Sequence, residues 1–355
     1  MHFEHSFQTP RVIFGEGCIS RVSDEARALD GTRVLVFGGE ERPFTRRVSR
    51  LLNERVVGHV HDIKEHVPTA QAEAASRRAI ELSADLLVAV GGGSTIGTAK
   101  AVARRTSTPI LAVPTTFAGS EMTSIWGETD GRQKTTGRDL KVLPRTVIYD
   151  PDLVLSLPVR TAALSGLNAL AHSAEAIYDA NGAPLVKLAA LDSARALGQG
   201  LSALRWTYTP AVLTALQYGS YLAGLALGNA TMGLHHKLCH VLGGMERLPH
   251  SGLHAVLLPY VLAFVEPAAG EVLGELADSL ESDNAADQIW QLGRDLGGPT
   301  SLTEIGFDPT TVEEAVHRVL SSPPQSPRHL DADALRRLLT AACDGLTPRA
   351  YREEE

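Results

Sequence analysis

Short β-branched runs that alternate with helical patterns are the feature that most restricts how this chain folds. Four such runs, each too short to form a helix, occur within the first 114 residues. The predicted strands are Arg33–Phe37, Val56–His61, Asp85–Val90 and Pro109–Pro114, and the predicted helices are Pro43–Glu54, Ala70–Leu82 and Ile96–Arg104. Strands separated by helices indicate βαβ units, and therefore a parallel sheet with helices on its faces.

The residue composition and periodicity of the sequence change after Pro158. From there on, alanine and leucine recur with helical periodicity and no strand pattern is apparent. The helical stretches are Val159–Leu204, Pro210–Leu242, His254–Leu280 and Ala286–Leu296. The sequence therefore predicts an α/β domain over residues 1–157 and an all-helical domain over residues 158–355. Ser321–Pro327, rich in serine and proline, is predicted to be a loop.

Charge and composition exclude several classes of function. The 355 residues carry a net charge of -8, which argues against nucleic-acid binding because phosphate contacts require a basic face. No apolar run approaches the roughly 20 residues that span a bilayer. The three cysteines are irregularly spaced, so a disulfide framework is not expected. With no leader-like segment near Met1, we expect a cytoplasmic protein without membrane or nucleic-acid partners.

Glycine-rich and hydroxyl-rich turns follow three of the predicted strands. Glycine lets the backbone approach a phosphate closely, and the N-terminus of the following helix presents free N–H groups. A tight strand-to-helix turn would explain the glycines equally well, but ligands of open α/β sheets bind beyond the carboxyl ends of the strands. We therefore predict a dinucleotide site. Its residues are Gly38, Gly39, Gly92, Gly93, Ser94, Thr115, Thr116 and Ser120.

Histidines gather in the second half of the chain. Five of the thirteen lie between residues 235 and 254. His236 and His240 share one helix face, and a separate stretch carries Asn168 and His172 at the same spacing. Imidazoles on apolar helices require partners, so a functional pocket is the better interpretation. His172, His236 and His250 suit a divalent metal, but Asn168 offers only a neutral amide where a carboxylate would bind more strongly.

Several motifs together resemble the iron-containing (group III) alcohol dehydrogenase family, and in particular its maleylacetate reductase branch. The resemblance covers nearly the whole chain, and its most specific motifs are Gly233–Gly244 and Leu248–His250. The other motifs are Arg11–Gly15, Gly91–Ser94, Pro114–Thr123, Lys134–Gly137, Val147–Pro151 and Ser165–His172. The resemblance implies the dehydroquinate synthase-like fold of this family, with an N-terminal α/β dinucleotide-binding domain and an all-α C-terminal domain. It also implies a homodimer.

The resemblance further implies the chemistry of the site. The family's metal ligands match Asn168, His172, His236 and His250, and the aspartate-to-asparagine change is similar to the reductase branch. Gly97, at a position where the family often has aspartate, is another such feature. A site without carboxylates repels a dianion less, so we expect a dicarboxylate substrate and no metal. The expected reaction is NAD(P)H-dependent reduction of maleylacetate to 3-oxoadipate in the degradation of aromatic compounds.

Roles follow for the individual side chains. The expected catalytic residues are His240, His236 and Lys134, and the expected substrate-binding residues are Asn168, His172, His250 and Lys237. Glu40 favours NADH by accepting a hydrogen bond from the ribose 2′-hydroxyl, whereas a nearby arginine group offers a 2′-phosphate site and leaves NADPH acceptable. That group consists of Arg42, Arg46 and Arg47.

Other functions stay open at this level. One alternative is a metal-dependent alcohol dehydrogenase, and another is a non-redox or binding derivative of the scaffold in a biosynthetic pathway. Two local departures from the reductase pattern also leave the substrate open to another anionic enone or keto acid. They are Ser124, where proline is usual, and Pro323–Arg328, which lacks the expected aromatic residue and Asn-Pro-Arg.

Overall fold

The computed structural model describes residues 4–131, 133–246 and 248–353 and divides the chain into two compact units. The α/β unit spans Phe7–Leu157 and includes Thr209–Gln217, and the helical unit comprises Pro158–Tyr208 and the chain from Tyr218 onward. Each unit has its own core and is described by itself.

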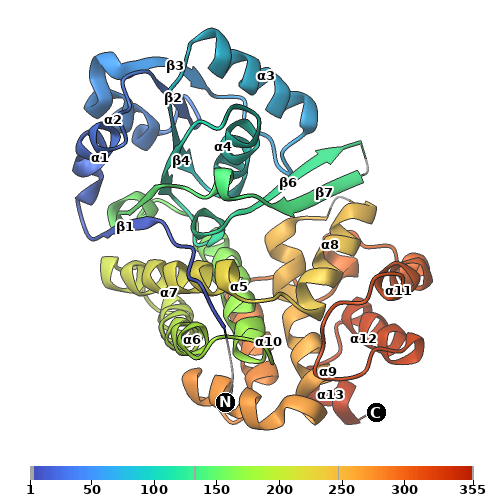
Figure 1. Cartoon of the computed structure of the whole chain (residues 1–355). Coiled ribbons are helices and arrows are strands. Elements are labelled where there is room, and N and C mark those ends of the chain that lie inside the picture. Colours follow the sequence, from blue (N-terminus) through green and yellow to red (C-terminus); the bar gives the residue numbers. More distant parts are fainter. Residues whose placement is uncertain (1–3, 132, 247, 354–355) are drawn as a thin grey trace. The chain divides into compact units, whose positions relative to one another are not determined.

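A six-stranded parallel sheet forms the centre of the α/β unit (Figure 1), in the order β1-β8-β5-β4-β2-β3. The strands are β1 (Arg11–Phe14), β2 (Val34–Phe37), β3 (Val56–Val60), β4 (Leu86–Gly91), β5 (Ile110–Pro114) and β8 (Thr146–Tyr149). The helices of this unit are α1 (Val22–Ala28), α2 (Pro43–Leu52), α3 (Thr69–Glu81) and α4 (Gly93–Thr106). The predicted parallel sheet is confirmed, and β1 and β8 add two strands to the four that periodicity indicated.

Alternation along the strands places apolar side chains on both faces of this sheet. Val34 and Val36 point into a core shared with Val22 of α1 and Val48 of α2. The intervening Leu35 and Phe37 are also fully buried. Burial on both faces explains why the strands are continuously apolar, as in other parallel sheets covered by helices on both sides.

A β-hairpin of β6 (Ile125–Asp130) and β7 (Gln133–Arg138) also belongs to this unit. Periodicity missed it because its strands are rich in threonine, glycine and charge. Lys100 of α4 holds the segment that leads into β6 against this helix. Its Nζ donates to the carbonyl oxygens of Ser120, Thr123 and Ile125 at 2.6, 2.7 and 2.9 Å.

Replacing Lys100 by methionine is expected to destabilise the α/β unit by about 3 kcal/mol, because carbonyl oxygens around this buried side chain lose a strong donor. In a thermal unfolding experiment the melting temperature should fall by about 8 °C. The exposed Lys141 supplies the control, since Lys141→Met should leave the transition in place. Equal melting temperatures for both variants would contradict this account of Lys100.

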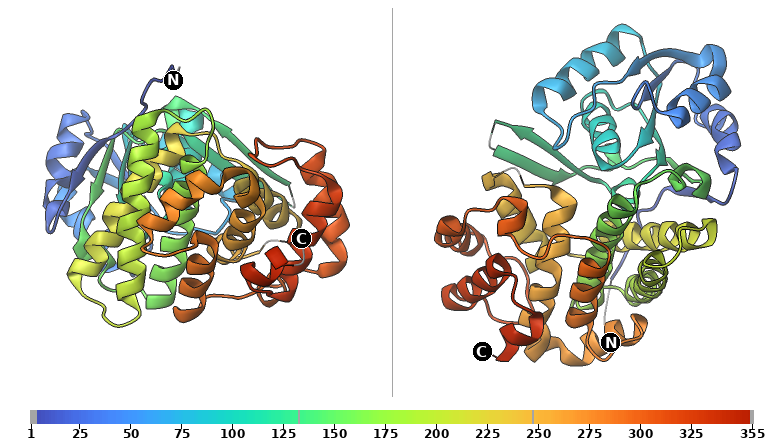
Figure 2. Two further views of the ribbon diagram at one scale, coloured as in Figure 1. Left: turned by 90° about the horizontal axis from the view of Figure 1, so that it is seen from below. Right: turned by 180° about the vertical axis from the view of Figure 1, so that it is seen from behind.

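The chain after Pro158 is helical, and no strand occurs there among the residues that the structure describes (Figure 2). The helices are α5 (Val159–Ile177), α6 (Pro184–Leu204), α7 (Pro210–Asn229), α8 (Leu234–Glu246), α9 (His250–Ser279), α10 (Ala285–Asp295), α11 (Val312–Leu320), α12 (Ala332–Asp344) and α13 (Pro348–Glu353). Two of the predicted helical stretches are each divided in two, at residues 178–183 and 230–233. Proline at the first position of α6 explains one of the restarts.

Within the helical unit, α5 packs against α6 and α9, and α8 packs against α9. By length and composition alone, α7 and α9 are apolar enough to cross a membrane, although no membrane-spanning run was expected from the sequence. In each helix, 61% of the most apolar 18-residue stretch is buried inside the protein, as in the core helices of folded domains. Ser321–Pro327 is a loop between α11 and α12, as predicted.

Candidate active site

The glycine-rich turns of the α/β unit gather at one edge of the sheet. Parallel pairing aligns Phe37 with Ala89, and Gly91 with Pro114, so that β2, β4 and β5 end together. The predicted cofactor residues lie in the turns that follow these strands, except that Gly93 and Ser94 are the first residues of α4 and Ser120 lies further along the chain after β5. This edge is where open α/β sheets bind their ligands.

Close backbone approach requires glycine in two of these turns. A Cβ atom on Gly38 would lie 2.8 Å from the carbonyl oxygen of Val90, and the φ of Gly38 is +153°. A Cβ atom on Gly92 would lie 3.0 Å from the side chain of Thr116. The Thr115 N–H donates to the Gly91 carbonyl at 3.1 Å, which holds the two loops together. Gly38 and Gly92 therefore let these turns pack closely against the neighbouring strand and loop.

Helix α4 begins at Gly93, directly after the second of these turns, and has no acidic residue in its first turn. Its unpaired N–H groups and the positive end of its dipole favour an anion such as a pyrophosphate. Glu40 and Arg42 are exposed just after β2, and the guanidinium of Arg46 donates to Glu41 at 3.2 Å. The contact of these residues with a dinucleotide stays a prediction.

A chain of three buried side chains lies in the helical unit. His236 Nδ1 is 2.5 Å from Glu175 Oε2, and His236 Nε2 is 2.8 Å from His172 Nδ1. Glu175 and His172 belong to α5, about one helical turn apart, and His236 belongs to α8. The three side chains thus join the two helices through hydrogen bonds. Asn168 is buried one turn before His172, and its Oδ1 has no hydrogen-bond partner among the described residues.

Glu175 is a fully buried carboxylate held on several sides. It accepts hydrogen bonds from the backbone N–H groups of Gly233 and His235, at 3.0 and 2.7 Å, and from the Tyr178 hydroxyl at 3.1 Å. Burial by itself raises the pKa of Glu175, but the adjacent His236 and these donors outweigh it and lower the pKa to about 2. Glu175 is therefore ionised at neutral pH and can only accept hydrogen bonds.

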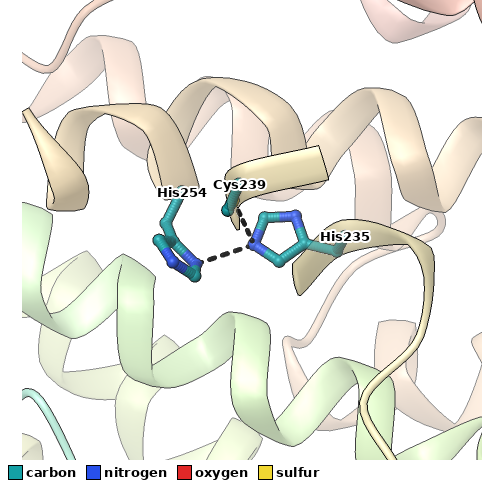
Figure 3. A group of neighbouring side chains, drawn as sticks. All are labelled: His235, Cys239 and His254. Carbon is teal, nitrogen blue, oxygen red and sulfur yellow. Dashed lines mark hydrogen bonds between the residues drawn. The ribbon is translucent and has the colours of Figure 1, made fainter. Parts of the chain in front are cut away.

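A second imidazole pair, His235 and His254, lies next to His236, and Figure 3 shows this pair together with Cys239. His235 Nε2 is 2.8 Å from His254 Nδ1 and 3.6 Å from Cys239 Sγ. The ring of His254 also lies near other histidines, with centroid distances of 4.5 Å to His250 and 5.2 Å to His236. Burial lowers the pKa of His235 to about 3 and moves the pKa of His254 in the same direction. Both imidazoles are therefore neutral at pH 7.

In the described part of the chain, the possible ligand atoms that lie close together are not those of the residues that match the family's metal ligands. Within the described residues, His235, Cys239 and His254 form the one group of three such side chains whose donor atoms lie within 4.8 Å of one another. His172 and His236 instead hydrogen-bond to each other, and Asn168 adds no charge. His235 and His254 also hydrogen-bond to each other. Their other ring nitrogens, Nδ1 of His235 and Nε2 of His254, have no hydrogen-bond partner in the described part of the chain. In most metal-bound histidines, by contrast, the nitrogen that does not bind the metal donates a hydrogen bond.

The predicted site residues form three groups that differ in burial and in the unit that carries them. Asn168, His172 and His236 are buried together, whereas His240 and His250 are exposed on α8 and α9, and Lys237 is half-buried on α8. Lys134 lies on β7 of the α/β unit, and its catalytic role stays a prediction. No role for Glu175 or His254 was expected from the sequence. The spacing of Glu175, three residues after His172 on an apolar helix, was the available signal.

The loop that departs from the reductase pattern contacts this site. A Cβ atom on Gly233 would lie 3.0 Å from the carbonyl oxygen of Gln325 and 3.2 Å from Glu175 Oε1. Arg328, at the end of the same loop, donates to the carbonyl oxygen of Phe264 in α9 at 3.0 Å. The loop around Gln325 therefore lies against the N-terminus of α8.

The neutral buried imidazoles predict a pH-dependent stability. The unfolded chain protonates His235 near pH 6.5, whereas the folded protein does so only near pH 3, so stability is lost as the pH falls through this interval. Between pH 7 and pH 5 His235 should contribute a loss of about 2 kcal/mol in the free energy of unfolding. Urea titrations at both values should show that loss reduced in His235→Gln and unchanged in His317→Gln, an exposed-histidine control.

Comparison with known families places this geometry in context. The model of the iron-containing alcohol dehydrogenase matches residues 9–151, and the model of the C-terminal part of the Fe-containing alcohol dehydrogenase family matches residues 162–343. The chain belongs to the iron-containing alcohol dehydrogenase family. The resemblance inferred from the sequence motifs is thereby confirmed, and the two matches follow the α/β region and the helical region of the chain.

Individual members of the family are similar to this chain over almost its whole length. A maleylacetate reductase from Burkholderia cepacia is 44% identical over 343 residues, which cover 96% of this chain and 97% of that protein. The crystal structure of the maleylacetate reductase from Rhizobium sp. strain MTP-10005 has a TM-score of 0.92 at 36% identity, covering 98% of this chain and 100% of that one. The corresponding enzyme from Agrobacterium tumefaciens also has a TM-score of 0.92, at 35% identity and the same coverage.

Proposed function

We propose that this protein reduces the C=C bond of maleylacetate, with NADH as the preferred reductant, to give 3-oxoadipate. The observation that carries the proposal is the 44% identity, over nearly the full length, to a maleylacetate reductase. The chemistry of the site supports it. The buried cluster around Asn168 and His172 presents amide and imidazole groups, and its one carboxylate, Glu175, is occupied by internal donors. Such a site suits a dicarboxylate.

The proposed reaction is a hydride transfer followed by protonation. When bound beyond β4 and β5, the dinucleotide supplies a hydride to the substrate carbon that is β to the ketone. Negative charge then develops on the ketone oxygen, where donors of the helical unit such as His172 and Lys237 stabilise it. His240, the exposed imidazole one turn beyond His236, delivers a proton to the carbon adjacent to the ketone. The hydride and this proton together saturate the C=C bond. His250 and Asn168 hold the carboxylates.

The preference for NADH rests on the residues that follow β2. Glu40 is exposed there and can accept from a ribose 2′-hydroxyl, whereas Arg46, a candidate for a 2′-phosphate, is already paired with Glu41. Arg42 and Arg47 leave NADPH acceptable. The expected assembly is a homodimer. The expected compartment is the cytoplasm, where cysteines that form no disulfide, as here, are usual.

Metal independence is the second part of the proposal. Position 168 has no carboxylate, His172 and His236 are bonded to each other, and the carboxylate of Glu175 already accepts from internal donors, so the cluster offers a divalent cation no uncommitted anionic ligand. The decisive experiment follows NADH oxidation by absorbance with maleylacetate, before and after treatment with a chelator. Turnover that survives chelation is the expected result. Stoichiometric iron or zinc together with inactivation by EDTA would instead identify a metal-dependent alcohol dehydrogenase.

The alternative to an enzyme is a binding protein without redox activity. Fluorescence titration with NADH separates it from an enzyme, because the enzyme must bind the dinucleotide at the glycine-rich turns. Absence of NADH binding would therefore overturn the proposed reductase. Binding of NADH without turnover of maleylacetate would overturn only the substrate, and other anionic enones and keto acids would then be assayed.

A further inference from the structure

Two histidines of the α/β unit form a stacked pair beside the glycine-rich turn that follows β2. His59 belongs to β3, and His61 directly follows this strand. Residues two apart on a strand share one face, and the two imidazole rings stack with their centroids 5.0 Å apart and their planes at 12°. β3 pairs with β2, and β2 packs against α2 (Figure 1). The pair therefore lies at the edge of the sheet where the proposed dinucleotide binds.

His61 holds the turn after β2. The Gly38 N–H donates to the Val60 carbonyl at 3.1 Å, and the Gly38 carbonyl oxygen lies 2.8 Å from His61 Nδ1. Because a carbonyl oxygen only accepts, His61 must carry a hydrogen on Nδ1. Nε2 of the neutral ring is then an acceptor. The ring is half-buried, and Nε2 has no hydrogen-bond partner in the part of the chain that the structure describes.

His59 is fixed in the opposite tautomer. Its Nε2 lies 3.0 Å from the Ser49 hydroxyl of α2, and that hydroxyl donates its one hydrogen to the Thr45 carbonyl, also at 3.0 Å. Ser49 therefore accepts from His59, which carries its hydrogen on Nε2. Nδ1 of the neutral ring is left as an acceptor on an exposed side chain. Each ring thus uses one nitrogen to bind the protein and leaves the other for a ligand.

We propose that His59 and His61 are specificity-determining residues that bind the adenosine ribose of the dinucleotide. The inference deepens the proposed function and rests on it for the presence of a dinucleotide. As neutral rings, the two histidines offer two acceptors to the ribose hydroxyls of NADH, in addition to the carboxylate of Glu40. As charged rings, they present N–H donors and positive charge, which suit the 2′-phosphate of NADPH. The preference between the two cofactors therefore depends on pH.

The surroundings of the pair leave the charge of its imidazoles as the variable. Burial and the adjacent His61 lower the pKa of His59, and the carboxylate of Glu40 opposes them. Carboxylates, guanidinium groups and ammonium groups keep their charges between pH 6 and pH 8. Groups of these three kinds are exposed on α2 and in the turns after β2 and β3, namely Glu40, Glu41, Arg42, Arg46, Arg47, Arg50, Asp62, Lys64 and Glu65. His66 also follows β3, and it is kept in every variant below, so that its titration cancels in the comparison.

The test measures the dissociation constants of NADH and NADPH by fluorescence at pH 8 and pH 6. A bound phosphate dianion raises the pKa of an adjacent imidazole, so protons and NADPH should bind together. In the wild-type protein, the ratio of the NADPH constant to the NADH constant should fall about tenfold from pH 8 to pH 6. The 2′-phosphate itself gains a proton near pH 6, which changes the ratio in the opposite direction.

Two substitutions remove the nitrogens left for the ligand but keep the contacts with the protein. In His61→Asn the amide nitrogen replaces ring Nδ1 and can still donate to Gly38, and in His59→Gln it replaces ring Nε2 and can still donate to Ser49. In the double variant the ratio should no longer fall as the pH is lowered. NADH should also bind about fivefold more weakly at pH 8, because hydrogen bonds to the ribose hydroxyls are lost. His317→Gln, at an exposed position of α11, is the control and should behave as the wild-type protein does.

The outcomes separate this inference from the proposed function. A ratio that does not fall in the wild-type protein, or an equal fall in the double variant, would overturn the role of the histidine pair alone. If the double variant does not fold, His59→Gln, at an exposed position, gives the same comparison and should reduce the fall to about threefold. Absence of binding of both dinucleotides would overturn the reductase and this inference together. If both bind as expected while maleylacetate is not turned over, the substrate assignment fails and the role of the pair stands.

Discussion

Replacing His240 by alanine is expected to lower kcat for maleylacetate reduction by about 1000-fold, because the enolate formed by hydride transfer loses its proton donor. His240 is exposed on α8, one helical turn beyond His236, whose own nitrogens are bonded to Glu175 and His172. Among the two histidines assigned to catalysis from the sequence, His240 is therefore the better proton donor. Stopped-flow or steady-state absorbance of NADH measures the effect directly.

The control for this experiment is His317→Ala, which removes an exposed histidine from α11 in the same unit. It should leave kcat unchanged, and both variants should bind NADH as the wild-type protein does. A kcat for His240→Ala within about tenfold of the wild-type value would contradict its role as proton donor, since general acids contribute about 100-fold or more.

Replacing Asn168 by aspartate is expected to raise KM for maleylacetate by about 100-fold. The new carboxylate would be buried beside His172, where a unit charge about 4 Å from a substrate carboxylate is repelled by about 4 kcal/mol at an effective dielectric constant of about 20. Partial screening reduces this figure, but the direction is fixed by the sign of the two charges. An unchanged KM would show that the dicarboxylate does not bind near Asn168.

The same substitution should create a metal site. An aspartate would supply the anionic ligand that the amide lacks, and His172, His236 and His250 are the remaining matches to the family's ligands. After incubation with Zn²⁺ and dialysis, mass spectrometry should detect close to one metal ion per chain in the Asn168→Asp variant and much less in the wild-type protein. Thr207→Asp, an exposed change in the same unit, controls for added charge and should alter neither KM nor metal content.

The α/β unit was predictable to a large degree because its signals are local. β-Branched runs such as Val34–Phe37 are too short for helices, and the glycines after them need backbone conformations or contacts that other residues cannot provide. The hairpin of β6 and β7 carried no such signal. Its strands are stabilised by pairing with each other and by Lys100 and α4, which a local pattern does not reveal.

The helical unit was predictable in its elements but less so in its contacts. Periodicity identified the helical stretches, and the spacing of Asn168 with His172 placed them on one face. Glu175 escaped notice because a single glutamate on an alanine-rich helix resembles a solvent-facing residue. Its full burial depends on α8 beginning against α5, where two backbone N–H groups and His236 compensate its charge.

By itself the sequence determined the parallel sheet, the glycine-rich turns at its edge, the family, and the absence of a carboxylate at position 168. These properties depend on residue type and on spacing along one element. Only the tertiary structure decided that His236 lies between Glu175 and His172, and that His235 pairs with His254. Those pairings join residues on different helices, and the rotation and packing of each helix, rather than its own sequence pattern, bring the paired atoms within hydrogen-bonding distance.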